Sequence, residues 1–166
     1  MIGEAEMKIE YEPIGVVHSP HTTPEGMPIQ PSRARGVRGT VEVDPRYAEA
    51  LSDLDGFSHV ILLCHLHRSK PYRLKVVPFL DTVERGLFAT RAPSRPNPIG
   101  LSVVRLVEVR GCRLSVEGVD LLDGTPVLDI KPFVPDFDDG TEVRLGWLEE
   151  ARRRAAVSDH RFDEPD

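Results

Sequence analysis

The stretch Phe57-Ser58-His59-Val60-Ile61-Leu62-Leu63-Cys64-His65-Leu66 is almost entirely apolar and contains two adjacent β-branched residues. The turn pair Asp55-Gly56 comes directly before it. A short apolar run that follows a turn signal and contains β-branched residues is typical of a strand buried on both faces. We therefore predict that this strand lies at the centre of a barrel or sheet.

Strands also precede and follow this run. The β-patterned segments are Pro13 to Pro20, Val37 to Val43, Leu101 to Val109, Arg113 to Leu121 and Val127 to Ile130. Asp44 and Pro45 predict one short helix, because Asp caps helices well and Pro suits the first helical turn. A doubly wound fold would instead alternate strands with long helices. The predicted fold class is therefore mainly β, with short helices.

The apolar phase of the predicted strand Arg113 to Leu121 changes within the strand. Leu114 and Val116 share one face, and the pattern then shifts to Val119 and Leu121. Gly118 lies at the shift, so we predict a β-bulge there.

The end of the chain has a helical period. Leu145, Leu148, Ala151 and Ala155 recur on one side, which predicts a C-terminal helix over about residues 142–157, anchored by Trp147. The two ends of the chain, residues 1–12 and 158–166, are expected to be disordered. A length of 166 residues favours a single domain, residues 1–166, with its core at about 13–139.

The charge of the chain is unevenly distributed. The net charge is -6, but from Gln30 to Arg95 eleven Lys and Arg face seven Asp and Glu, while the remainder has ten against twenty. A phosphate-bearing partner is therefore expected to meet the middle of the chain; a scattered solvated surface is the alternative. Without a membrane span or signal peptide, the sequence predicts a cytoplasmic protein. Cys64 and Cys112 read as small buried hydrophobes.

The stretch Phe88-Ala89-Thr90-Arg91-Ala92-Pro93-Ser94-Arg95-Pro96-Asn97-Pro98-Ile99-Gly100-Leu101-Ser102 reads as a binding loop. Three prolines in six residues fix the backbone and remove donors, which excludes a helix interior or a central strand. A loop with so little backbone freedom can hold Arg91, Arg95 and Asn97 in place before a ligand binds. The alternative is a stiff connector between two strands.

Two histidines raise the question of a metal. His65 and His67 are predicted to lie on one strand face, about 7 Å apart at Cα, so a shared ion is geometrically possible. His59 is too far along the strand to join them, and no third ligand has a suitable spacing. We therefore predict no metal, and expect the histidines to line a pocket or pack.

Four segments together resemble the TsaA/TrmO-like family: residues 13–20 (PIGVVHSP), 28–31 (PIQP), 88–102 and 120–132 (DLLDGTPVLDIKP). The likeness runs from about residue 13 to 139. It implies a small β-barrel that binds S-adenosylmethionine, associates as a homodimer, and methylates N6 of threonylcarbamoyladenosine at position 37 of tRNA, beside the anticodon.

The resemblance also assigns residues. The cofactor positions fall on Pro28, Ile29, Gln30, His67, Arg68, Arg91, Leu101, Leu122, Asp123, Gly124 and Thr125. Arg91 can hold the methionine carboxylate, and Asp123 can accept from ribose hydroxyls or an amino group. Arg95, Asn97 and Lys131 serve either RNA or loop architecture. Longer bacterial relatives have an additional C-terminal region, which leaves open how this chain grips tRNA.

Methyl transfer from a sulfonium mainly requires alignment in a sheltered site. The acceptor nitrogen must also lose a proton, for which His65, His67 and Asp123 are the candidate bases; alternatively, the proton leaves to water. Two other functions remain open on the sequence: a non-enzymatic module that binds S-adenosylmethionine or RNA, and a methyltransferase that acts on a small molecule.

Overall fold

The computed structural model describes residues 8–24, 34, 36–138, 143–149 and 151. The chain divides into two compact units. The first comprises Met1–Ser69 and Asn97–Phe133, and the second comprises Lys70–Pro96 and Val134–Asp166. The single domain expected from the chain length stays a prediction.

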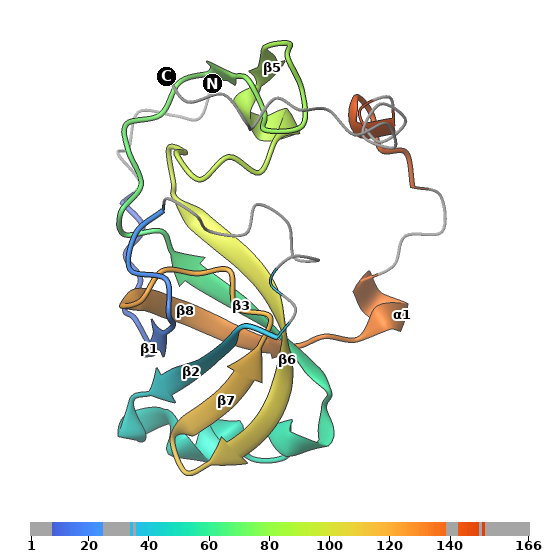
Figure 1. The fold of residues 1–166 in the computed structure, drawn as a ribbon. Coiled ribbons are helices and arrows are strands. Elements are labelled where there is room, and N and C mark those ends of the chain that lie inside the picture. The colour runs from blue at the N-terminus through green and yellow to red at the C-terminus, as the bar shows by residue number, and fades with distance from the viewer. Residues whose placement is uncertain (1–7, 25–33, 35, 139–142, 150, 152–166) are drawn as a thin grey trace. The chain divides into compact units, whose positions relative to one another are not determined.

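The first unit is a closed barrel of six antiparallel strands (Figure 1). Its strands are β1 (Gly15–His18), β2 (Arg38–Val43), β3 (His59–His65), β6 (Ile99–Arg110), β7 (Arg113–Glu117) and β8 (Thr125–Pro132). The order around the barrel is β1-β2-β7-β6-β3-β8, and β8 pairs with β1 to close it. Closure removes exposed sheet edges. The prediction of a small, mainly β barrel is confirmed.

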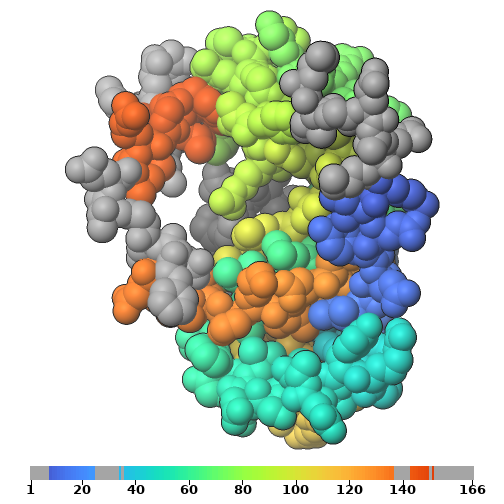
Figure 2. All heavy atoms as spheres, turned by 180° about the vertical axis from the view of Figure 1, so that it is seen from behind, coloured from blue at the N-terminus to red at the C-terminus, as the bar shows by residue number. Residues whose placement is uncertain are grey.

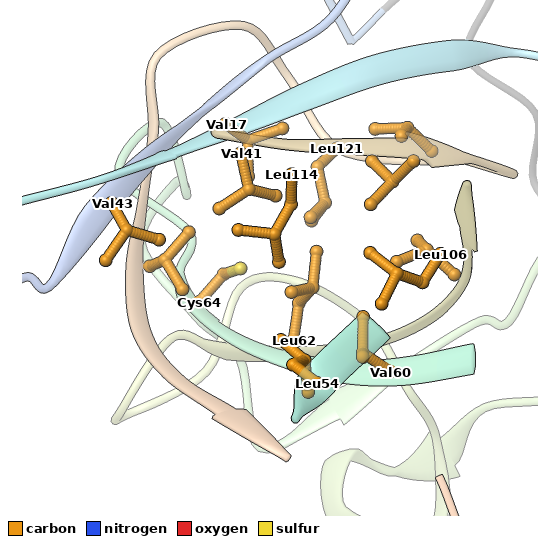
Figure 3. Packing of buried hydrophobic residues seen from close by; sticks show 14 of the residues in the cluster. Val17, Val41, Val43, Leu54, Val60, Leu62, Cys64, Leu106, Leu114 and Leu121 are labelled. Atoms are coloured by element: carbon orange, nitrogen blue, oxygen red, sulfur yellow. The ribbon is translucent and has the colours of Figure 1, made fainter. Parts of the chain in front are cut away.

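The barrel interior is filled by one face of each strand. On β3, Val60, Leu62 and Cys64 are fully buried and pack with side chains such as Val17 and Leu114 (Figure 3). The opposite face of β3 is only half-buried or exposed. The prediction that this strand is buried on both faces is therefore wrong, because a barrel strand buries only its inward side chains.

Two short 3₁₀ helices, η1 (Pro45–Leu51) and η2 (Leu54–Gly56), connect β2 to β3. The Asp44 carboxylate accepts from the backbone N–H of Arg46 at 2.9 Å, and Pro45 occupies the first helical turn. The predicted short helix is thus confirmed, with 3₁₀ geometry. Leu51 and Leu54 are buried in the core cluster of the barrel.

A hairpin joins β6 to β7, and Gly111 lies in its turn at a φ of 59°. Beyond β7, Gly118 has a φ of 90°, and the N–H groups of Gly118 and Val119 both donate to the carbonyl of Val37. In a β-bulge, two residues of one strand lie opposite a single residue of the partner strand. The contacts of Gly118 and Val119 with Val37 therefore match the β-bulge that the phase shift predicts. The ladder register also shifts between Leu106 and Glu108 of β6.

The second unit contains a two-stranded sheet of β4 (Lys75–Val76) and β5 (Arg85–Gly86), the 3₁₀ helix η3 (Leu87–Ala89) and the short helix α1 (Pro135–Asp138). The predicted C-terminal helix begins late: residues 143–145 are not helical, and Leu148 and Glu149 are. Much of its predicted range lies outside the described residues. Within the part that is described, no helix is long and apolar enough to cross a membrane.

Candidate functional site

Residues 122–125, here called the Asp123 corner, turn the chain into β8. Gly124 has a φ of 78°, which favours glycine because it lacks a Cβ. The hydroxyl of Thr125 donates to the Leu122 carbonyl at 2.7 Å and closes the turn. Thr125 is buried, whereas Asp123 and Gly124 are exposed. The corner therefore has a fixed inner side and an accessible outer side.

The Asp123 corner is bonded to the segment that leaves β1. The backbone N–H of Asp123 donates to the carbonyl of His21 at 2.7 Å, and that of Gly124 donates to the carbonyl of Val17 at 2.8 Å. The N–H of Ser19 in turn donates to Oδ1 of Asp123 at 3.1 Å. Within the described part of the chain, Oδ2 of Asp123 has no hydrogen-bond partner. One carboxylate oxygen is thus held by the protein, and the other is open to a donor on a ligand.

His18, which the sequence did not point to, lies beside this carboxylate. Its Nδ1 is 3.5 Å from Oδ1 of Asp123, and its Nε2 is 3.2 Å from Oε2 of Glu42. Both ring nitrogens can donate at once only in an imidazolium. The three side chains come from distant parts of the sequence, so spacing offered no signal for them.

An open hollow lies at this place on the barrel. Its volume is about 410 Å³, and it is lined by His18, Ser19, Pro20, Arg38, Gly39, Thr40 and Asp123. Gly39 leaves no room for a larger residue, because an added Cβ would come within 2.8 Å of both the His18 carbonyl oxygen and Cγ2 of Val119. The hollow offers a cation, an imidazole and a carboxylate, a donor and acceptor set suited to a polar ligand.

A part-buried hydrogen bond joins β6 to Asp120, three residues before Asp123. The hydroxyl of Ser102, on β6, donates to Oδ1 of Asp120 at 2.5 Å, and Ser102 is only 5% exposed. Burial, and secondly the Asp120 carboxylate, raise the pKa of the Cys64 thiol to about 12. Cys64 is therefore a neutral, buried side chain, as expected from the sequence, whereas Cys112 is only half-buried and the same expectation is wrong for it.

Other predicted cofactor residues of the barrel unit have separate surroundings. Arg68 donates through Nη1 to the carbonyl of Thr22 at 2.8 Å, so it holds the segment that leads toward Pro28. Pro28, Ile29 and Gln30 themselves lie outside the described residues. Leu101 is 53% exposed on the outer face of β6, where it pairs with Leu63 of β3.

His65 and His67 do not share a strand face, so that part of the prediction is wrong. β3 ends at His65, and the N–H of His67 donates to the His65 carbonyl at 2.9 Å in a turn. Both residues are exposed. In the described ranges, no three His, Cys, Asp or Glu residues come together as a ligand set for a metal.

Asn97 and Lys131 also belong to the barrel unit and are exposed. The backbone carbonyl of Asn97 accepts from the N–H of Ile99 at 2.8 Å. The ammonium of Lys131, on β8, lies 2.8 Å from Oδ2 of Asp129. Lys131 thus has a carboxylate partner on its own strand, and its charge is partly neutralised there.

Arg91 and Arg95 belong to the second unit, in residues 87–96, here called the Arg91 loop. Arg95 is half-buried and donates through Nη1 to the carbonyls of Thr90 at 2.9 Å, Ala92 at 3.3 Å and Leu87 at 3.5 Å. Arg91 is exposed. Its guanidinium makes no hydrogen bond or ion pair with any residue that the structure describes. The two arginines therefore differ: one is engaged within the loop, and one faces solvent.

Comparison with known proteins gives a consistent result. A family model described as the tRNA-methyltransferase O N-terminal domain matches residues 16–139. A Pyrococcus abyssi protein named "Probable S-adenosyl-L-methionine-binding protein" is 55% identical over 143 residues, which cover 86% of this chain and 78% of that protein. A mouse protein named tRNA (adenine(37)-N6)-methyltransferase is 40% identical over 136 residues, which cover 76% of this chain and 31% of that protein.

Solved structures agree. The crystal structure of TrmO from Pseudomonas aeruginosa superposes with a TM-score of 0.73 at 44% identity. The match covers 84% of this chain and 62% of that one. The chain thus spans less than two thirds of the TrmO chain and about a third of the mouse protein.

Proposed function

The chain belongs to the family of tRNA-methyltransferase O N-terminal domains, and from this membership we propose that it transfers a methyl group from S-adenosylmethionine to N6 of an adenosine in tRNA. The relatives named for S-adenosylmethionine binding and for tRNA adenine methylation support both halves of the proposal. Within the structure, the observation that carries it is the Asp123 corner, where one carboxylate oxygen is fixed by the protein and the other is open.

The groups of this chain suit S-adenosylmethionine, which when bound supplies a methyl group on a positively charged sulfur. The open Oδ2 of Asp123 can accept from the vicinal hydroxyls of the ribose or from an amino group. The exposed guanidinium of Arg91 suits the carboxylate of the methionine moiety, because Arg binds carboxylates in a bidentate fork. Arg68 orders the start of the segment that contains Pro28 to Gln30, which completes the proposed set of cofactor residues.

We further propose threonylcarbamoyladenosine at position 37 as the acceptor. The excess of Lys and Arg from Gln30 to Arg95 supports a polyanionic partner such as tRNA in an otherwise acidic chain. A cytoplasmic location follows from this substrate. Asn97 and Lys131 are exposed polar residues that can contact RNA.

The proton on N6 has to leave during the reaction. Of the candidate bases, Asp123 has a carboxylate oxygen open to the hollow, while His65 and His67 are exposed at the end of β3. We propose that the proton leaves to water, because the one open oxygen of Asp123 is already assigned to the cofactor, and Asp123 as the base is the alternative. A variant that loses cofactor affinity but keeps its single-turnover rate would remove Asp123 from the base role.

We propose a homodimer, supported by exposed apolar side chains in residues 70–96, the green segment in Figure 2. Leu74 is 73% exposed, Phe79 71% and Phe88 77%. Large exposed apolar side chains that cluster along one segment mark interaction surfaces in soluble proteins. A second copy of the chain would bury them.

The test is methyl transfer from radiolabelled S-adenosylmethionine to tRNA that carries or lacks the threonylcarbamoyl group. We expect label in the modified tRNA, at N6, and none in the unmodified control. Cofactor retention with no transfer to either RNA would favour a binding module. Transfer to a small acceptor in the absence of RNA would favour a small-molecule methyltransferase. Either result would overturn the proposal.

A further inference from the structure

We infer that Arg95 is a positioning residue that holds Arg91 in its ligand-binding position, and that it is not itself a ligand contact. The inference rests on the proposed function, because it takes Arg91 as the group that binds the cofactor carboxylate. Its basis is the contacts of the Arg95 guanidinium. Two of its three acceptors are the carbonyls of Thr90 and Ala92, the residues directly before and after Arg91.

The composition of the loop explains why a side chain has this task. Pro93 and Pro96 have no N–H group, so the loop has fewer backbone donors for its own carbonyls than a loop without proline. Carbonyls without partners are costly when they are shielded from water. Arginine has five N–H donors in a rigid fork, more than any other side chain. A half-buried Arg95 can therefore satisfy several carbonyls from one position and fix the backbone that contains them.

Further bonds in the same unit hold the Arg91 loop. The hydroxyl of Thr90 donates to the Leu87 carbonyl at 2.8 Å and accepts from the N–H of Ala92 at 3.3 Å. Trp147 donates through Nε1 to the carbonyl of Ala89 at 2.8 Å. The Arg95 guanidinium also lies over the Phe88 ring, 5.6 Å from its centroid. The backbone on both sides of Arg91 is thus set before a ligand binds.

Arg91 and Arg95 therefore have different roles, although both carry a positive charge. The three hydrogen bonds that Arg95 makes with described residues all come from Nη1 and are all directed to the loop itself. Arg91 is exposed and has no partner in the described part of the chain. Binding a carboxylate with an arginine whose backbone is already fixed avoids the entropy cost of ordering the loop at that moment. Arg95 contributes to affinity through Arg91 alone.

The experiment measures S-adenosylmethionine binding by calorimetry in the absence of RNA, on the full chain. The variants are Arg91→Ala, Arg95→Met, Arg95→Lys and the double variant Arg91→Ala/Arg95→Met. Arg95→Met keeps the apolar stem but removes every donor, and we expect about tenfold weaker binding, or about 1.4 kcal/mol. Arg95→Lys keeps an ammonium with three donors and should recover part of the affinity. Arg110→Lys, an exposed arginine on the β6–β7 hairpin, is the matched control and should bind as the parent does.

The double variant provides the sharpest result. If Arg95 acts through Arg91, the double variant binds no more weakly than Arg91→Ala alone, because the position that Arg95 maintains no longer matters. Additive losses would overturn the inference, as would parent-like cofactor binding by Arg95→Met. If Arg91→Ala itself binds normally, the proposed role of Arg91 fails, and this inference fails with it. Circular dichroism of each variant confirms folding, and if Arg95→Met does not fold, Arg95→Lys replaces it in the cycle.

Discussion

Asp120 and Asp123 are close in sequence, yet their carboxylates have different surroundings. Asp120 is half-buried, accepts from Ser102 and lies near the thiol of Cys64. Asp123 is exposed and keeps one oxygen open. A buried carboxylate needs donors from the protein, whereas an exposed one can serve a ligand. Asp120 therefore suits support of the fold, and Asp123 suits binding.

The first prediction concerns the support that Ser102 provides. Ser102→Ala removes the donor to Asp120 at a site that is 5% exposed. Leaving a shielded carboxylate without this bond should lower the free energy of unfolding by about 1–3 kcal/mol, measured by urea denaturation. Ser58→Ala, which removes an exposed hydroxyl next to His59, should change it by less than about 0.5 kcal/mol. Equal effects of the two variants would show that the Ser102 bond has no special role.

The second prediction concerns the two thiols. Because burial and the Asp120 carboxylate raise the pKa of Cys64 to about 12, its thiolate is nearly absent at pH 8. With Ellman's reagent, the half-exposed Cys112 should react quickly in the native protein, and Cys64 only after denaturation. Two thiols that react at the same rate in the native protein would contradict the buried position of Cys64.

At the scale of elements, the strands and turns could be predicted because their signals are local. Alternating apolar residues, the Asp44-Pro45 helix start and the phase shift at Gly118 all lie within a few residues of the structure they specify. The failures have tertiary causes. The exposed face of β3 and the early end of that strand before His67 depend on barrel geometry. The late helix start at Leu148 shows that a periodic pattern does not define its own boundary.

The same distinction applies to the site. The turn at Asp123-Gly124 and the stiff loop around Arg91 could be predicted, because Asp-Gly pairs favour turns and prolines restrict the backbone. The position of His18 between Glu42 and Asp123 could not be predicted, because the fold brings together three residues that are distant in sequence. The different roles of Arg91 and Arg95 could not be predicted either, since both are arginines in the same proline-rich loop. Only their contacts separate them.

The third prediction tests the closest approach of two strands. Gly15 of β1 pairs with Val43 of β2, and a Cβ at Gly15 would fall against the Glu42 carbonyl oxygen and 3.0 Å from the Val43 Cα. Gly15→Ala should therefore destabilise the barrel by about 1–3 kcal/mol in urea unfolding. Gly56→Ala is the control, because no atom lies within 4 Å of its added Cβ. A Gly15→Ala barrel as stable as Gly56→Ala would contradict the described β1–β2 pairing.

At the scale of the whole molecule, the barrel provides a rigid frame with the Asp123 corner at its surface, and the second unit presents the Arg91 loop and exposed apolar side chains. Each unit has residues that the proposed activity requires. A polar cofactor site and an apolar association surface are separate demands on the sequence, and residues 70–96 contribute to both, through Arg91 and through exposed side chains such as Phe79.

The fourth prediction concerns association. If residues 70–96 form the proposed dimer surface, light scattering after size exclusion should give twice the chain mass of 18.5 kDa. Phe79→Glu, at a side chain that is 71% exposed, should shift the mass toward that of one chain, since a charge buried at an apolar interface is costly. A parent protein with the mass of one chain at all concentrations would contradict the proposed dimer. If Phe79→Glu remains a dimer, the dimer interface does not include Phe79.

The most direct test of the central claim is calorimetric titration of S-adenosylmethionine into the parent, Asp123→Asn and Asp55→Asn. If Asp123 offers its open oxygen to the cofactor, Asp123→Asn should bind at least about tenfold more weakly, because hydrogen bonds to charged groups contribute about 1.5–3 kcal/mol. Asp55→Asn, which changes an exposed carboxylate on η2, should bind as the parent does. Equal affinity of Asp123→Asn and the parent would contradict the account.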